Sequence, residues 1–169
     1  VTHDQHEALQ ISDSIIVLHR GRVEQCAAPR DVFDSPATPF VAEFVGESNS
    51  FEAELRAGAV VWGPLRLRVA AADADAGARG GGRVRVFFRP GDVYVTRTRE
   101  AVDGASHAPV EASIASMLFR GPMTELALDF GDGERLTALV PKGVIESSGF
   151  YVDARVFLSI TAFRVFPAV

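Results

Sequence analysis

Residues 83–89 read Arg-Val-Arg-Val-Phe-Phe-Arg and are followed at once by Pro90-Gly91. Arginine and apolar side chains alternate along most of this segment, which predicts a strand with one apolar and one charged face. Proline removes a backbone donor, so Pro90-Gly91 ends the strand. Residues 65–69, Leu-Arg-Leu-Arg-Val, repeat the alternation. The two stretches together predict a sheet that packs one face against a core.

Further short segments of the same kind continue on both sides and are separated by turn residues. They cover residues 51–55, 93–95, 110–119, 124–130, 135–140 and 154–166, with a hairpin turn at Gly131-Asp132-Gly133. This spacing is typical of a small β-barrel or sandwich. Residues 70–82 are rich in Ala and Gly and predict a flexible loop. A phosphate cradle is not expected there because a strand, and not a helix, follows.

The first part of the chain has a different pattern. A short helix is expected after Thr2 or Asp4, and a hairpin is expected from strands at 14–18 and 22–26 around Arg20-Gly21. Two short helices that begin with proline follow, at 29–34 and 39–45. The polar run after Gly46 then marks a boundary. We therefore predict two domains, residues 1–47 with α/β character and residues 48–169 with an all-β fold.

Composition narrows the classes of function. Of the 169 residues, 47% are hydrophobic and 23% charged, which is enough for a packed core. The formal net charge is -5, and residues 1–50 carry 3 Arg against 8 acids. A nucleic-acid binder is therefore not expected. The single Cys26 excludes an internal disulfide, and no apolar run reaches the ~20 residues of a transmembrane helix. Because Val1 stands where an initiator Met is expected, we interpret the chain as a piece of a longer protein.

Few residues have a pattern that indicates chemistry. His3 and His6 lie three apart, but nothing completes a metal site, so no metal is expected. The only lysine, Lys142, is not in a phosphate-binding loop of the form G-x-x-x-x-G-K-[ST], so we expect no ATPase activity from this chain alone. Arginine makes up the rest of the basic residues. Three arginines lie beside Pro, Gly or apolar residues and could bind an oxyanion through the planar guanidinium: Arg89, Arg120 and Arg164.

The order of several short motifs adds a family resemblance. Val1-Thr2-His3-Asp4-Gln5, Glu7-Ala8-Leu9, the strand at 14–18, Gly21-Arg22-Val23-Glu24-Gln25 and Pro29-Arg30-Asp31-Val32-Phe33 resemble the last stretch of an ABC transporter ATPase. Residues 36–49 resemble the connector of importer ATPases that carry an extra C-terminal domain. Phe88-Arg89-Pro90-Gly91-Asp92-Val93, residues 118–122 and Phe163-Arg164-Val165-Phe166 resemble that domain, which is called transport-associated OB.

The resemblance implies a specific fold and site. Residues 1–47 would be the end of the nucleotide-binding domain, a short α/β remnant, and residues 48–169 an OB-like small β-barrel with a regulatory role. His3 would be the switch histidine that reaches the γ-phosphate of ATP in the intact parent, where ATP and Mg2+ are the cofactors. No cofactor is expected in this segment by itself, which lacks the remaining ATPase motifs.

The resemblance also implies partners and a location. The parent would be the ATP-binding subunit of a bacterial importer, held on the inner face of the cell membrane by its permease subunits. The C-terminal domains would form a homodimer and receive an oxyanion effector. Sulfate, thiosulfate or molybdate is the expected cargo, and polyamine, ferric iron or sugar import and a stand-alone oxyanion sensor are the alternatives. How the strands at 14–26 pair outside the ATPase core is left open.

Overall fold

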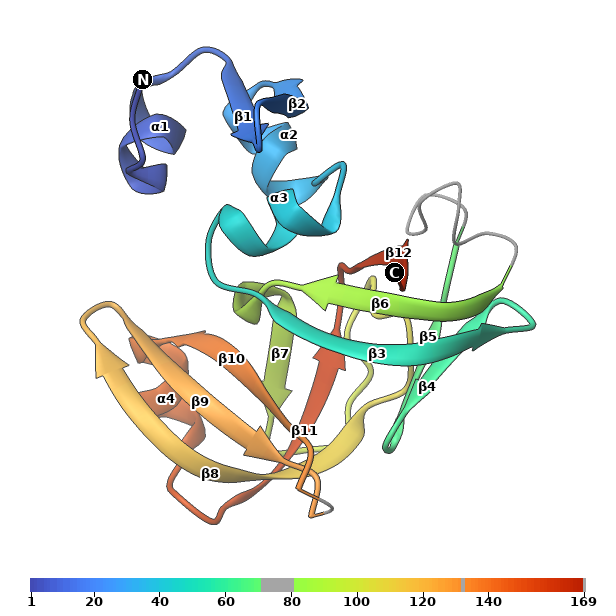
Figure 1. Cartoon of the computed structure of the whole chain (residues 1–169). Coiled ribbons are helices and arrows are strands. Elements are labelled where there is room, and N and C mark those ends of the chain that lie inside the picture. Colours follow the sequence, from blue (N-terminus) through green and yellow to red (C-terminus); the bar gives the residue numbers. More distant parts are fainter. Residues whose placement is uncertain (71–80, 132, 169) are drawn as a thin grey trace. The chain divides into compact units, whose positions relative to one another are not determined.

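The computed structural model describes residues 1–70, 81–131 and 133–168 (Figure 1). The chain forms two compact units, Val1–Ser48 and Asn49–Val169. Most of the loop predicted at 70–82 lies outside the described residues. In the described part of the chain, no helix has the length and apolar character that crossing a bilayer requires.

The first unit consists of short helices and one hairpin, and the reasons for its helix starts are local. Its elements are α1 (Gln5–Ile11), β1 (Ile15–His19), β2 (Arg22–Ala27), α2 (Pro29–Asp34) and α3 (Pro39–Phe44). Asp4 caps α1, Thr38 caps α3, and proline begins both α2 and α3. Arg20 and Gly21 have φ of 50° and 76°, as a two-residue hairpin turn requires.

A small apolar core holds the first unit together. It consists of Val17, Val32, Val41 and Val45. The opposite face of the hairpin remains exposed, with Ile16 and Leu18 on β1 and Val23 paired with Leu18. The hairpin thus has one covered and one uncovered apolar face.

The second unit consists of two antiparallel five-stranded sheets. The first has the order β12-β6-β3-β4-β5, and its strands are Arg164–Pro167, Gly82–Phe88, Asn49–Arg56, Ala59–Trp62 and Leu65–Arg68. The second has the order β10-β9-β8-β11-β7, and its strands are Arg135–Pro141, Met123–Asp129, Val110–Arg120, Arg155–Ile160 and Val93–Thr96. The predicted mainly-β fold is confirmed.

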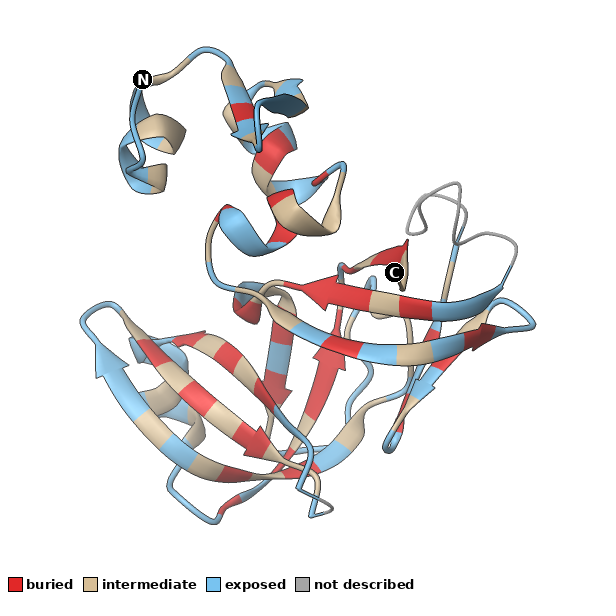
Figure 2. Cartoon of the chain, viewed as in Figure 1, coloured by how far each residue is buried: buried red, intermediate tan, exposed pale blue. Residues whose placement is uncertain are grey.

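Alternating burial follows the sequence pattern, as Figure 2 shows. In β6 the valines at 84 and 86 are fully buried, whereas Arg83 is exposed. Inward side chains of both sheets form one core, in which the Phe51 ring is stacked on Trp62 with ring centroids 4.4 Å apart. The apolar face predicted from residues 83–89 therefore packs into this core.

The two sheets are joined at two places, each of which involves the edge strand of one sheet. The Asn49 side chain donates to the Thr137 carbonyl at 2.8 Å and accepts from the Thr137 N–H at 2.7 Å, linking β3 to β10. Elsewhere, Ser106 accepts from the Arg68 N–H of β5 at 3.4 Å and donates its own N–H to the Ile160 carbonyl of β11 at 3.2 Å. These bonds pair backbone groups of β10 and β5, which as edge strands have a neighbouring strand on one side only.

The structure differs from the sequence expectations at four places. The segment 154–166 is two strands, β11 and β12, which belong to different sheets. Two elements were missed: strand β4 and helix α4 (Lys142–Ser148). In addition, Pro90–Asp92 forms a turn of 3-10 helix, η1, where only the end of a strand was expected.

Candidate functional site

His3 lies on an exposed segment just before α1, and its neighbours are ordered by a local hydrogen-bond network. The Asp4 N–H donates to Thr2 Oγ1 at 3.0 Å, and the Thr2 hydroxyl donates to Glu7 Oε2 at 2.9 Å. Asp4 Oδ1 in turn accepts the Glu7 N–H at 3.0 Å. The imidazole of His3 is therefore presented to solvent from a capped helix start.

The charge on Asp4 is stabilised by the same arrangement. The hydrogen bond from the Glu7 N–H is the main cause that lowers the pKa of the Asp4 carboxyl, and the nearby His6 and His3 add to it. Burial opposes the shift. The ionised carboxylate is thus a capping group, as the sequence indicates for a residue at this position.

The three predicted oxyanion-binding arginines come from two sheets. Arg89 directly follows β6 and begins η1, where its N–H donates to Asp92 Oδ2 at 3.3 Å. Arg164 lies on the neighbouring β12, opposite Phe87 of β6. Arg120 ends β8 in the other sheet, and its guanidinium is ion paired with Glu125. An anion at Arg120 would have to compete with this carboxylate.

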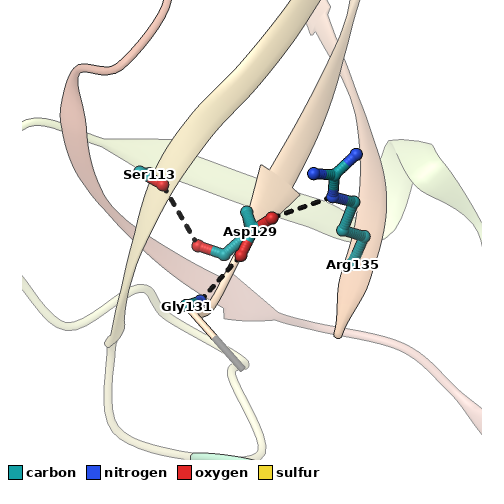
Figure 3. A network of polar contacts seen from close by, with 4 residues as sticks. All are labelled: Ser113, Asp129, Gly131 and Arg135. Atoms are coloured by element: carbon teal, nitrogen blue, oxygen red, sulfur yellow. Dashed lines mark hydrogen bonds and ion pairs between the residues drawn. The ribbon is translucent and has the colours of Figure 1, made fainter. Parts of the chain in front are cut away.

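The hairpin between β9 and β10 carries a polar network (Figure 3). Asp129 accepts the Gly131 N–H at 2.7 Å and Arg135 Nε at 2.8 Å, and its carbonyl accepts the Ser113 hydroxyl at 3.4 Å. The Gly131 bond and then the Arg135 bond lower the pKa of the Asp129 carboxyl. The network orders a turn, and we assign it no chemistry.

His107 is a notable polar residue that the sequence analysis did not single out. Its Nδ1 lies 2.6 Å from the Ala108 carbonyl oxygen, and its Nε2 lies 3.0 Å from the Ile160 nitrogen. Burial lowers the pKa of the imidazole, and the Ala108 bond opposes that shift. No sequence signal marks this residue, because its partner is 53 positions away.

The described residues contain no cluster of side chains that could bind a metal ion. Over residues 1–70, 81–131 and 133–168, no group of three or more His, Cys, Asp or Glu side chains is arranged to hold an ion. Arg30, Arg83 and Arg155 form ion pairs with carboxylates that are more than half exposed.

The fold resembles one solved structure closely enough to define its class. The cytoplasmic molybdate-binding protein ModG, whose structure contains molybdate, aligns with a TM-score of 0.57 over 71% of this chain and 96% of its own. The identity is 15%, so the likeness concerns the fold alone. The chain is thus a mainly-β protein with a ModG-like fold.

Several sequence relatives are ATP-binding subunits of importers. The sulfate/thiosulfate import ATP-binding protein of Chromobacterium violaceum is 41% identical over 131 residues, 76% of this chain and 33% of that protein. The one from Nitrosomonas europaea is 34% identical over 143 residues, 82% of this chain and 36% of that protein. The spermidine/putrescine import ATP-binding protein of Nitratidesulfovibrio vulgaris is 32% identical over 148 residues, 82% of this chain and 38% of that protein.

The chain is therefore homologous to the ATP-binding subunits of ABC importers, as the motif order predicted. It spans little more than a third of the length of these relatives. No protein-family model matches it.

Proposed function

We propose that this chain is the C-terminal part of the ATP-binding subunit of a bacterial ABC importer for sulfate or thiosulfate. Residues 1–47 would complete the nucleotide-binding domain, and residues 48–169 would be its regulatory domain. The observation that carries the proposal is the 41% identity to a sulfate/thiosulfate import ATP-binding protein over 76% of the chain. The lower identity to a polyamine-import relative makes polyamine uptake the second candidate.

The exposed apolar face of the β1–β2 hairpin supports this assignment. Ile16, Leu18 and Val23 are each more than half exposed on adjacent strands, and a contiguous apolar surface of this kind marks an interaction site. We propose that the remainder of the nucleotide-binding domain covers this face. The subunit would sit on the inner face of the membrane through its permease partners and would dimerise through the second unit.

In this proposal His3 acts on ATP in the intact subunit. An imidazole can donate to phosphoryl oxygens or hold the attacking water as charge develops in the transition state. ATP and Mg2+ would bind to residues that the relatives carry outside the matched segment. The exposed position of His3 beside the ordered start of α1 is compatible with contact to such a partner surface.

A chimeric subunit tests this role. We expect that this chain, replacing the matching segment of the Chromobacterium violaceum relative, supports sulfate uptake in cells that lack their own ATP-binding subunit. His3→Ala should lower ATP hydrolysis and uptake by about 10²–10³-fold, the usual cost of removing one transition-state donor. The assays are radiolabelled sulfate uptake in cells and phosphate release from the purified transporter.

The matched control is His6→Ala, because His6 is also exposed and lies only three residues away. It should leave both rates close to those of the unmodified chimera. Equal losses in the two variants would contradict a special role of His3. A chimera that assembles with the permease but imports spermidine and not sulfate would overturn the proposed cargo.

The second unit is proposed to bind an oxyanion effector through Arg89, Arg120 and Arg164. Its likeness in fold to a molybdate-binding protein motivates the idea. We expect one of sulfate, molybdate or tungstate to raise the Tm of the chain. At ~100 times its Kd, a ligand adds roughly 2.7 kcal/mol, or about 5–10 °C for a domain of this size.

Thermal shift at fixed ionic strength measures this effect. Arg164→Gln should abolish the shift, whereas Arg66→Gln on the exposed face of β5 should retain it. Equal shifts with every anion would indicate a salt effect and contradict a specific site. If no oxyanion raises the Tm, dimerisation remains as the proposed role of the second unit. If spermidine alone raises the Tm, polyamine import is favoured.

A further inference from the structure

A short segment links the two sheets at a second place, besides the Asn49 bonds. We name residues Ser106–Ala108 the strap. On one side, the Arg68 N–H at the end of β5 donates to the Ser106 carbonyl. On the other side, the Ser106 N–H and hydroxyl donate to the carbonyl of Ile160, the last residue of β11, at 3.2 and 3.3 Å. The strap thus connects β5, an edge strand of the first sheet, to the end of β11, an inner strand of the second.

The imidazole of His107 provides a further bond between the strap and β11. The Ile160 N–H can only donate, so Nε2 at 3.0 Å must be the unprotonated acceptor. The Ala108 carbonyl can only accept, so the ring proton lies on Nδ1, 2.6 Å from that oxygen. Both bonds require the neutral ring with its proton on Nδ1, and they use both nitrogens.

Protonation is incompatible with this arrangement. An imidazolium carries N–H groups on both nitrogens, so Nε2–H would face the Ile160 N–H at the distance of a hydrogen bond. The ring must then leave the Ile160 N–H, which would lose its acceptor. Because unpaired backbone groups are costly when removed from water, the strap would separate from β11 or the Ile160 N–H would have to reach solvent.

We propose that His107 is a pH-sensitive latch: the neutral ring fastens the strap to the Ile160 N–H of β11, and its protonation breaks this link and leaves the Ser106 bonds as the remaining ones to β11. This device concerns the second unit alone and does not depend on the cargo or on the ATPase assignment. Acidification would loosen the junction between β5 and β11 while the core shared by the two sheets remains packed.

Charged groups on the surrounding elements do not take part in the latch bonds. Within the described part of the chain, the ring is hydrogen bonded only to the two main-chain groups named above. The Asp92 carboxylate of η1 accepts from the Arg89 N–H, and the Asp92 carbonyl accepts from the N–H of Thr161, which follows β11. The other charged side chains of the adjoining segments are exposed: Arg66, Arg68, Glu100, Asp103, Glu111 and Arg155.

The direction of the pH effect follows from linkage. Burial lowers the pKa of His107 below its ordinary value of 6.5, so the unfolded or released form binds more protons in the interval between the two values. The contribution of the His107 bonds to the free energy of unfolding is therefore fully present above pH 6.5. It decreases as the pH falls from 6.5 toward the pKa of the folded state. Each pKa unit by which the folded and unfolded states differ at His107 corresponds to about 3–5 °C of Tm for a domain of this size.

The test compares the 169-residue chain with His107→Gln. Glutamine places a non-titrating carbonyl oxygen near the position of Nε2 and can keep the Ile160 bond. We expect the Tm of the wild type to fall more between pH 7.5 and 5.5 than that of His107→Gln. The control His6→Gln, on the exposed face of α1, should have the same pH dependence as the wild type.

Two measurements on the wild type keep the test decisive if His107→Gln does not fold. An NMR titration should give His107 a pKa below 6.5, and the protection of the Ile160 amide against hydrogen exchange should fall on acidification after correction for the intrinsic rate. A pKa at or above 6.5, Ile160 protection that is independent of pH, or equal pH dependence in His107→Gln and the wild type would each overturn the latch.

Discussion

Replacing Phe51 by alanine should lower the free energy of unfolding of the second unit by about 3–5 kcal/mol, the usual cost of removing a buried aromatic ring. Phe51 lies on the inner face of β3 and is 8% exposed. Its ring stacks on Trp62 of β4 at 5° between planes and meets Phe88 of β6 edge-on at 6.1 Å. The substitution therefore removes contacts with both neighbouring strands and leaves a cavity between them.

Urea unfolding measures this loss, with two probes. Trp62 is the single tryptophan, so its fluorescence reports on this core, and circular dichroism reports on the strands. Phe119→Ala is the matched control, because Phe119 on β8 is 65% exposed and should cost less than about 1 kcal/mol. A loss below about 1 kcal/mol for Phe51→Ala as well would show that the β3–β4 face is not the packed core of the unit.

The period of the sequence accounts for most of the strands. Alternation predicts β5 and β6 because their two faces differ: Leu65 and Leu67 are fully buried, and Arg66 and Arg68 are exposed. The signal for β4 was also present, since the apolar run at 59–62 lies between Gly58 and Gly63. It was overlooked because four residues are too few for a clear period.

Other features had no usable local signal. Helix α4 is seven residues long, has Gly143 in its first turn and lacks a side-chain cap. The segment 154–166 reads as one apolar run, although its residues divide between two sheets. Sheet membership depends on partners far along the chain, which a local pattern cannot specify.

The candidate site shows the same division. Motif order made His3 and the three arginines candidates, but it could not show that Arg120 pairs with Glu125 or that it lies in a different sheet from Arg164. His107 carries no motif at all, because its role depends on Ile160, which folding brings to the ring. Sequence similarity thus identified homologous proteins, whereas the contacts that join the sheets required the structure.

Asn49 provides the second large effect, because its amide pairs with both backbone groups of Thr137, 88 residues away. Asn49→Ala removes two partly buried hydrogen bonds and should cost about 2 kcal/mol. Asn49→Asp should cost more at pH 7, about 2–4 kcal/mol, since a carboxylate can still accept from the Thr137 N–H but faces the carbonyl oxygen without a proton. Urea unfolding at pH 7 and at pH 4.5 measures both variants.

The pH dependence of the free energy of unfolding shows whether the Asn49 side chain acts through its hydrogen bonds or only by filling space. The repulsive carbonyl disfavours the ionised acid and would raise the folded-state pKa of the introduced carboxyl above its unfolded value. Its neutral form can donate to the carbonyl, so Asn49→Asp should regain stability relative to Asn49→Ala as the pH falls through that pKa. Ser50→Asp, on the next and exposed residue of β3, should show no such recovery. If Asn49→Asp and Asn49→Ala keep a constant difference across this range, the amide does not join β3 to β10 through the Thr137 backbone.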